Sequence, residues 1–478
     1  MKKSYLYIFI CLLIASCNSS EKKKGNTSET TENTITSYTA EEIKAETIRA
    51  WNAYKNYAWG FDVLLPLSKK GYNWYESSLG ISPFDAYSTL AVMGLDVEAK
   101  EIEKYALSKD WNQDVYVQVF EVNIRILGGL LAMYDHSKNP EILEKAIDFG
   151  NRILPAFDSP TGIPYHSVNL QTGKTAGNLG EGKGNIVNTA QAATYLLEFG
   201  ILSYYAKDPK YYQAAKKASL AVFNRKSEIG LPGDYINVET GEWTNNWSYL
   251  QAGMDSYYEY LFKGNYLFPD PEIEAAWKFS IEKINQYYSD VYQGKQFYAC
   301  VNMHTGEIVK QSMSLYDAFF PAIQALSGDV KTAEKNMSTW NWLWKKYKLL
   351  PTRYLYAEDK IEYANSELNP EIIESAYYLR QITGKQKYLN MIDTYWHDMK
   401  TCCRNEVAFN AVEDVRTMEA KDYLATYFYA ETLKYFYLAK ANKETFNFND
   451  YVFNTEAHPF KKSNFNRKNL KEYLGIEN

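Results

Sequence analysis

The chain has 478 residues, of which 46% are hydrophobic and 23% are charged, a composition typical of a soluble globular protein with a large core. The formal net charge of -6 argues against a basic surface for nucleic acid or anionic lipid, so we expect no nucleic-acid partner. Tyrosine is unusually frequent, with 43 residues beside 11 tryptophans. Aromatic faces suit sugar rings, although a coding bias towards Tyr, Asn, Lys and Ile explains the same count.

The N-terminus has the layout of an export signal. Two lysines precede an apolar run from Tyr5 to Ala15, which is too short to span a bilayer comfortably. The sequence Ile14-Ala15-Ser16-Cys17 resembles a bacterial lipobox, in which the cysteine is acylated and becomes the mature N-terminus. A plain signal peptide with a chance cysteine is the alternative.

The stretch after Cys17 is polar, rich in Ser and Thr, and without periodicity, which predicts a flexible tether. We therefore expect a lipoprotein signal peptide over residues 1–16 and a tether over 17–39. The protein would be a membrane-anchored lipoprotein of the bacterial cell envelope, and lipidated Cys17 would be its only membrane contact. The cysteines left in the mature chain, Cys300, Cys402 and Cys403, form neither a disulfide framework nor a zinc motif.

From about residue 40 the pattern is helical nearly throughout. One unit returns: an apolar helix, a small turn with Asp or Pro, and then an amphipathic helix. Buried inner helices and half-wetted outer helices predict an all-α barrel of six or seven helical hairpins, a single domain over 40–460 followed by a C-terminal tail over 461–478. An open solenoid fits the same pattern, but the irregular spacing and the lack of capping units favour a closed ring. The amphipathic helices begin near residues 94, 138, 207, 269, 328 and 384, and a last helix is expected near 421–441.

Residues 171–188, "QTGKTAGNLGEGKGNIVN", interrupt this pattern. So many Gly and Asn residues cannot form a core helix and indicate a surface loop or hairpin. Loops at the mouth of a barrel often shape a binding site, so we expect this one near the functional site.

Charged residues occur inside apolar helices. In "VFEVNIRILGGLL", residues 119–131, Glu121 and Arg125 are four apart and lie on one helix face. A buried charge is costly unless it is paired or used, so either a structural salt bridge or a functional site explains the pair. Glu431 in "YFYAETLKYFYLA" lies among Tyr and Phe where no helix cap is needed.

Further carboxylates stand at the starts of helices. Asp255 opens "DSYYEYL", and Glu371 and Glu374 follow Pro370, where capping and the helix dipole already favour acidic residues. Together, carboxylates that converge in an aromatic cavity suit glycoside hydrolysis or an oxygen-bound Ca²⁺. A di-metal centre would need Glu-x-x-His spacing, which is absent around all five histidines: His136, His166, His304, His397 and His458.

These segments resemble glycoside hydrolase family 47, the class I α-1,2-mannosidases, in the family's order along nearly the whole mature chain. The segment "SLYDAFFPAIQAL" (314–326) is similar to the branch that acts in ER-associated degradation. The resemblance implies an (α/α)7 barrel. The motifs that carry it are "AWNAYKNYAWGFDVLLPLS" (50–68), "FEVNIRILGGLL", "LPAFDSPTGIPYHSVNL" (154–170), "MDSYYEYL", "NPEIIES", "YFYAETLKYFYL" and "VFNTEAHPF" (452–460).

The resemblance also implies residue roles. Glu121 would be the general acid, Asp255 would assist it, and Glu371 would be the base. Thr455 would bind Ca²⁺ through its hydroxyl and carbonyl oxygens. The residues implied around the ion and the terminal sugar are Arg125, Glu374, Tyr427 (where the family usually has Phe), Glu431 and Glu456.

The implied function is that of a Ca²⁺-dependent inverting exo-α-mannosidase, a monomer that removes terminal α-1,2-linked mannose from high-mannose glycans or mannan. Four positions depart from the family pattern and leave the linkage and the glycan open: Gln191, Gly253, Leu315 and Asn369. The alternatives are a non-catalytic glycan-binding lipoprotein that keeps the barrel, and another helical-barrel enzyme such as an epimerase or lyase.

Overall fold

The computed structural model describes residues 37–177 and 184–477. The expected signal peptide, Cys17 and most of the tether lie outside the described residues, as does the middle of the 171–188 loop. Among the described residues, no helix is both long and apolar enough to cross a membrane.

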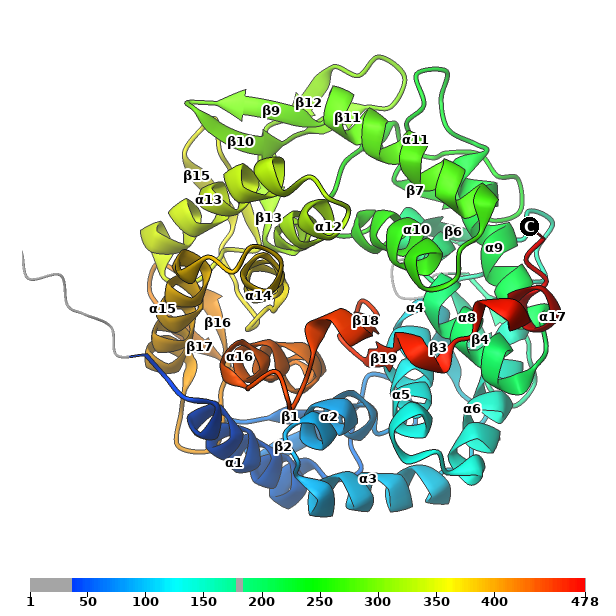
Figure 1. Ribbon diagram of the computed structural model, residues 1–478, viewed down its shortest axis with the longest axis horizontal. Coiled ribbons are helices and arrows are strands. Elements are labelled where there is room, and N and C mark those ends of the chain that lie inside the picture. The colour runs from blue at the N-terminus through cyan, green and yellow to red at the C-terminus, as the bar shows by residue number, and fades with distance from the viewer. Residues whose placement is uncertain (1–36, 178–183, 478) are drawn as a thin grey trace, which may run out of the picture. The chain divides into compact units, whose positions relative to one another are not determined.

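The described chain forms two concentric rings of helices (Figure 1). Each of seven inner helices packs against an outer one within the described residues, and α16 closes the ring against both α1 and α2. The prediction of a closed (α/α)7 barrel is therefore confirmed. The inner helices are α2 (Ile81–Val92), α5 (Gly128–Ser137), α8 (Leu196–Ala206), α10 (Asp255–Leu267), α12 (Phe320–Leu326), α14 (Glu371–Thr383) and α16 (Leu433–Lys440). The outer helices are α1 (Ala40–Ala58), α3 (Asp96–Ser108), α6 (Pro140–Ile153), α9 (Lys210–Phe223), α11 (Pro271–Tyr287), α13 (Val330–Tyr347) and α15 (Gln386–Cys403).

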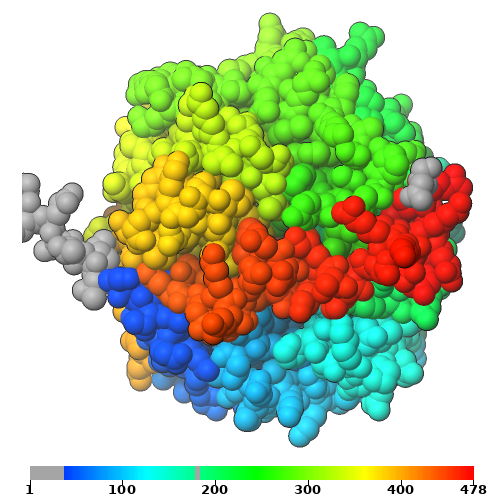
Figure 2. All heavy atoms as spheres, viewed as in Figure 1, coloured from blue at the N-terminus to red at the C-terminus, as the bar shows by residue number. Residues whose placement is uncertain are grey.

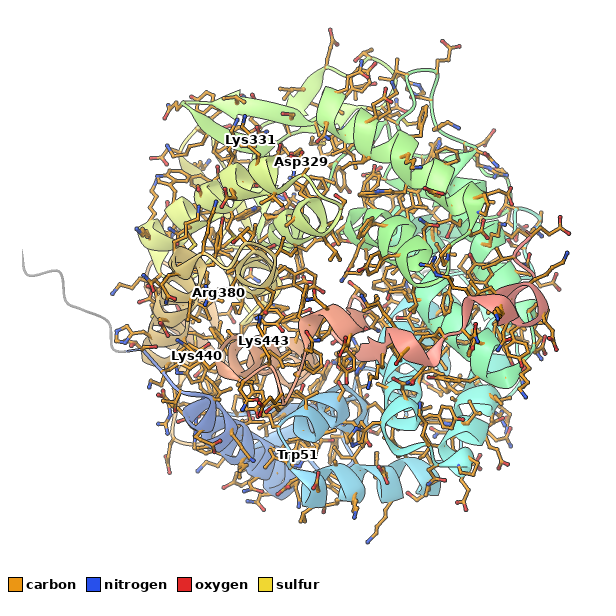
Figure 3. All side chains as sticks on the ribbon, in the orientation of Figure 1. Trp51, Asp329, Lys331, Arg380, Lys440 and Lys443 are labelled. Atoms are coloured by element: carbon orange, nitrogen blue, oxygen red, sulfur yellow. The ribbon has the colours of Figure 1, made fainter. Side chains whose placement is uncertain are left out.

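The sequence explains the two kinds of helix. Outer helix α6 begins where the Asn139 side chain accepts from the Glu141 amide and Pro140 takes the first position, and it buries one face only. Inner helix α8 is buried continuously from Leu196 to Tyr204, so most of its residues are apolar on every face and Glu198 is the charged exception. The ring closes on aromatic contacts: Trp51 of α1 (labelled in Figure 3) is fully buried, and its ring lies 5.8 Å from that of Tyr429.

Two inner helices begin with a π-helical turn, a feature common at functional sites. The first is η1 (Asn123–Leu127), between α4 (Val119–Val122) and α5, and the second is η4 (Phe428–Thr432), before α16. They carry Arg125 and Glu431. A short helix, α7 (Thr189–Ala193), precedes α8. One 3-10 turn, η2 (Leu154–Phe157), follows α6, and another, η3 (Leu315–Phe319), precedes α12.

Short antiparallel strands connect the helices, in larger number than the sequence pattern indicates. Within the described parts of the 171–188 loop, residues 175–176 form β5, which pairs with β4, and residues 186–188 form β6, which pairs with β7. The strands are β1 (Val63–Leu65), β2 (Lys70–Tyr72), β3 (Tyr116–Gln118), β4 (Ser167–Asn169), β5 (Thr175–Ala176), β6 (Ile186–Asn188), β7 (Tyr235–Asn237), β8 (Trp247–Ser248), β9 (Ser289–Tyr292), β10 (Lys295–Tyr298), β11 (Cys300–Asn302), β12 (Ile308–Lys310), β13 (Ser312–Ser314), β14 (Arg353–Leu355), β15 (Lys360–Tyr363), β16 (Ala411–Asp414) and β17 (Glu419–Lys421).

The last hairpin matters most for the site. Strands β18 (Tyr451–Phe453) and β19 (Pro459–Lys461) pair antiparallel near the centre of the ring in Figure 1. The turn between them, residues 454–458, carries Thr455 and Glu456 into the barrel. In Figure 2 the orange-to-red C-terminal segment crosses this face of the unit.

The folded unit continues past residue 460 into the segment expected to form a C-terminal tail. Two short turns, η6 (Lys462–Asn464) and η7 (Arg467–Asn469), lead to α17 (Leu470–Leu474), which packs on α8 and α9. Its apolar residues Leu470 and Leu474 are buried, so the folded unit continues beyond β19.

Candidate active site

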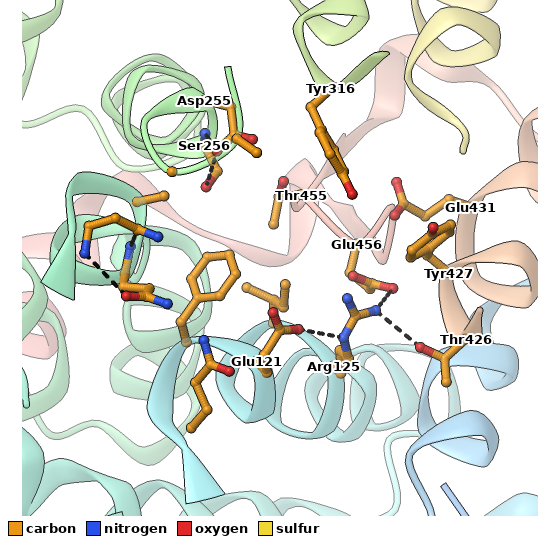
Figure 4. Close-up of a pocket in the computed structure, with 18 of the residues that line it drawn as sticks. Glu121, Arg125, Asp255, Ser256, Tyr316, Thr426, Tyr427, Glu431, Thr455 and Glu456 are labelled. Atoms are coloured by element: carbon orange, nitrogen blue, oxygen red, sulfur yellow. Dashed lines mark hydrogen bonds and ion pairs between the residues drawn. The ribbon is translucent and has the colours of Figure 1, made fainter. Parts of the chain in front are cut away.

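A cavity of about 570 Å³ opens among the inner helices (Figure 4), a size typical of small-molecule sites. The structure brings all three expected catalytic residues, Glu121, Asp255 and Glu371, to its wall. In the view of Figure 4, Glu121 and Asp255 lie on opposite sides, with Thr455 between them. Other expected residues in the wall are Arg125, Tyr427, Glu431, Thr455 and Glu456.

Arg125 connects the carboxylates at one side of the cavity. Its Nε donates to Glu121 Oε2 over 2.9 Å, and its Nη1 donates to Asp85 Oδ2 over 3.1 Å and also to Glu456. The guanidinium lies 5.3 Å from the ring of Trp74, within cation–π range. Glu121 and Arg125 therefore form a salt bridge, and both residues also line the cavity. The side chain of Glu121 remains 24% exposed, which leaves its carboxylate accessible from the cavity.

Asp255 is the first residue of α10. Its Oδ1 accepts from the Ser256 amide over 2.8 Å, a bond that favours the charged form. Burial outweighs this bond, and with the negative charges of Glu259 and Glu121 it raises the pKa of Asp255 to about 7. The carboxyl can therefore hold a proton near neutral pH, as a group on the acid side must.

Glu371 begins α14, directly after Pro370. Its Oε2 is buried and has no hydrogen-bond partner among the described residues. Burial raises the pKa of Glu371 well above its ordinary value, and the charges of Glu374 and Asp255 add to the effect. The amide Nδ2 of Asn369 lies 3.5 Å from Glu371 Oε1. Asn369, one of the four departures, is thus the residue beside the expected base, and it offers an amide without charge.

The turn of the β18–β19 hairpin is fixed by Asn454. Its Nδ2 donates to Glu198 Oε1 over 2.8 Å, and its Oδ1 accepts from the amides of Glu456 and His458 over 3.1 and 2.7 Å. Glu198 is completely buried on α8, and burial raises its pKa to about 7. It also accepts from Tyr260 Oη over 2.6 Å, so one carboxylate connects the turn to two inner helices.

A smaller cavity of about 50 Å³ is bordered by Thr455 and a group of carboxylates. Glu374 lies here rather than in the wall of the larger cavity, and its Oε1 is 3.4 Å from Lys263 Nζ. Burial raises the pKa of Glu374 to about 7 and that of Glu431 well above its ordinary value. Carboxyl groups are therefore concentrated around Thr455, and burial and mutual repulsion favour their protonated forms. In the part of the chain that the structure describes, no three acidic, histidine or cysteine side chains meet closely enough to hold a metal directly.

The other three departures from the family pattern lie at different places around the cavity. Gln191 and Gly253 line the cavity, whereas Leu315 is buried behind the wall and its neighbour Tyr316 faces the cavity. Gln191 closes a capping box with Asn188: its Oε1 accepts from the Asn188 amide over 3.1 Å. Gly253 has φ +101°, a conformation that suits glycine.

Sequence reasoning missed several residues of the site. Asp85 and Glu198 stand in apolar helices, the same signal that exposed Glu121, and their sequences "SPFDAYST" and "LLEFGIL" show it. The aromatic residues Trp74, Tyr75 and Tyr423 also line the cavity, but they come from connecting segments without a periodic pattern.

Carboxylates from separate helices that meet in one aromatic cavity are an arrangement that suits glycoside hydrolysis. The sequence profile of glycosyl hydrolase family 47 matches residues 46–462, and the chain belongs to this family. The chain is 33% identical over 447 residues to alpha-mannosidase I MNS4 of Arabidopsis thaliana. The alignment covers 87% of this chain and 69% of that protein. It is 31% identical over 455 residues to the human ER degradation-enhancing alpha-mannosidase-like protein 2, covering 88% and 77% of the two chains.

A solved structure agrees on the fold. The alpha-1,2-mannosidase from Trichoderma reesei superposes with a TM-score of 0.79 at 24% identity, covering 88% of this chain and 98% of that chain. The resemblance read from the sequence motifs is therefore confirmed.

Proposed function

We propose that the protein is an exo-acting α-mannosidase that hydrolyses terminal α-1,2-linked mannose with inversion and depends on Ca²⁺. The observation that carries the proposal is the convergence of Glu121, Asp255 and Glu371 on one cavity. The turn that carries Thr455 and Glu456 contributes to the wall of this cavity. The similarity to alpha-mannosidase I MNS4 of Arabidopsis thaliana and to the alpha-1,2-mannosidase from Trichoderma reesei supports the sugar and the linkage.

Each carboxylate has a distinct task in this mechanism. Glu121 acts in its protonated form: it gives its proton to the leaving oxygen and becomes the carboxylate that the Arg125 guanidinium holds in place. Asp255, with its pKa of about 7, assists on the acid side. Glu371 acts in its ionised form: its Oε2, which has no hydrogen-bond partner among the described residues, accepts the proton of the attacking water as this water adds to the anomeric carbon from the other face.

The residues around Thr455 fit a hydrated, oxygen-bound cation. Burial and mutual repulsion raise the pKa values of Glu371 and Glu431, which is the behaviour of carboxylates that lack positive charge. Thr455 would hold Ca²⁺ through its oxygens, and Glu374, Glu431 and Glu456 would accept hydrogen bonds from the ion's water. When bound, Ca²⁺ supplies positive charge beside the hydroxyls of the terminal mannose and favours its distorted form.

The test is a linkage-resolved assay with α-1,2-, α-1,3- and α-1,6-mannobiose, each with and without Ca²⁺. Release of mannose from the α-1,2 isomer in the presence of Ca²⁺ is expected. The neutral amide of Asn369 beside the base favours a second candidate, a glycan-binding protein without turnover. Binding of mannobiose without hydrolysis of any isomer would support that candidate and contradict the first.

We also propose that the protein acts as a monomer anchored in the bacterial cell envelope through acylated Cys17. The support is the lipobox-like sequence before Cys17 and the polar tether after it. Stable attachment takes more than one acyl chain, as a bacterial lipoprotein carries. Fractionation tests the anchor: the wild type should sediment with membranes and Cys17→Ala should be soluble, whereas a wholly soluble wild type would contradict it.

A further inference from the structure

Two lysines are completely buried on inner helices of the barrel, and their surroundings differ. Lys263 of α10 has carboxylate partners: Glu259 at 2.5 Å and Glu374 at 3.4 Å. Lys434 of α16 has neutral ones: its Nζ donates to Ser88 Oγ over 2.8 Å and to the carbonyl oxygen of Ala457 over 2.5 Å. A buried ammonium that is not paired with a carboxylate is costly, which raises the question of what it does.

The second acceptor of Lys434 belongs to the turn between β18 and β19. Ala457 has φ +53°, a left-handed conformation that costs about 1–2 kcal/mol for a residue other than glycine, so contacts from outside must hold it. Asn454, bound to Glu198, holds one end of the turn, and Lys434 holds the other. Thr455 and Glu456 lie between these two points.

Lys434 itself does not line either cavity at the site, so it cannot touch a bound sugar there. Burial lowers the pKa of Lys434 to about 7, although three carboxylates favour its ammonium form: Glu431, Glu456 of the turn and Asp85 of α2. The remaining titratable group beside it, His458, donates to or accepts from Ser88 Oγ over 3.0 Å, and burial lowers its pKa well below the ordinary value.

We propose that Lys434 is a positioning residue: through the carbonyl of Ala457 it fixes the turn that presents Thr455 and Glu456 to the substrate. Its effect on catalysis rests on the proposed function, whereas its effect on the turn does not. Removal of the ammonium should therefore loosen the turn and lower kcat, although no group that contacts substrate has changed.

The test compares Lys434→Met with Lys440→Met, a control on the same helix. Lys440 (Figure 3) lies at the other end of α16, where it pairs with Asp393 at 2.6 Å, away from the turn. Deuterium uptake by the peptide that contains residues 451–461 should rise in Lys434→Met alone. On α-1,2-mannobiose, kcat should fall at least tenfold in that variant, with a smaller change in KM, and should stay unchanged in Lys440→Met. Lys434→Arg, which keeps a charged donor, should recover part of the protection and of kcat.

Lys434→Gln keeps a polar group but is one bond shorter, so it gives the same comparison if the methionine variant does not fold. Uptake and kcat unchanged from the wild type in either folded variant would overturn the proposal. If the wild type hydrolyses no mannobiose, the proposed function fails, and raised uptake in Lys434→Met still supports the positioning role.

Discussion

Arg125 Nε donates to Glu121 Oε2 over 2.9 Å, and the same guanidinium binds Asp85 and Glu456 from two other elements. The Arg125 guanidinium therefore pairs with the carboxylate of Glu121, the expected acid, and also with the carboxylates of Asp85 and Glu456. The side chain of Arg125 is only 9% exposed, so water cannot solvate these carboxylates in place of the guanidinium.

Arg125→Met is expected to lower the free energy of unfolding by about 3–5 kcal/mol, because it leaves buried carboxylates without their partner. The matched control is Arg152→Met on outer helix α6, whose pair with Asp148 spans 3.0 Å at the surface and should be worth under about 1 kcal/mol. Urea denaturation of both variants measures the difference. Equal losses would show that the buried cluster is not held together by Arg125.

Glu121→Gln is expected to lower kcat by about 10²–10⁴ on α-1,2-mannobiose, whose leaving oxygen needs a proton. On a dinitrophenyl α-mannoside, whose leaving group needs none, the variant should keep most of its activity. Glu371→Gln should lose activity on both substrates, because the attacking water needs a base in each case. Steady-state kinetics with the two substrates measure this. Equal losses of Glu121→Gln on both would remove it from the role of acid.

The pKa of Asp255, raised to about 7, predicts a pH dependence of stability. An unfolded aspartate loses its proton near pH 4, whereas the folded one keeps it to about pH 7, so the folded state binds more protons in this window. Stability from this group is present below pH 4 and is lost as the pH rises towards 7. Asp255→Asn cannot titrate, so its free energy of unfolding should fall less than that of the wild type between pH 5 and pH 7.5. Parallel curves in urea titrations would contradict the raised pKa.

Removal of Ca²⁺ with a chelator is expected to abolish activity, and added Ca²⁺ should restore it. Thr455→Ala should weaken Ca²⁺ binding at least tenfold, whereas Thr455→Ser keeps the hydroxyl and should bind nearly as well as the wild type. Isothermal titration of the chelated protein measures the affinity independently of activity. An enzyme that is fully active in excess chelator, with no ion bound, would refute the metal requirement.

The sequence predicts the barrel well because its signal is long: a one-faced helix such as α6 and a buried helix such as α8 each repeat their pattern over several turns. The strands are only two to four residues long, too short for an alternating pattern to stand out. The C-terminal helix α17 has five residues, and its burial against α8 and α9 comes from long-range packing that periodicity cannot reveal.

The site was predicted in part. A charge inside an apolar run singled out Glu121, and family motifs assigned Asp255 and Glu371. Glu198 shows the same local signal, but its partner Asn454 lies 256 residues further along the chain, so its role could not be assigned before the fold was known. Lys434 was passed over for the same reason, since both acceptors of its ammonium come from other elements.

The stereochemistry of the first product tests the central claim most directly. An inverting enzyme separates its acid and base by roughly 6.5–9.5 Å to admit a water, whereas a retaining enzyme holds acid and nucleophile roughly 5–5.5 Å apart. With Glu121 on α4 and Glu371 at the start of α14, we expect a water between them and no covalent intermediate. Fresh hydrolysis of an α-mannoside followed by proton NMR should show β-mannose first. The appearance of α-mannose before mutarotation would contradict the mechanism and the assignment of Glu371 as the base.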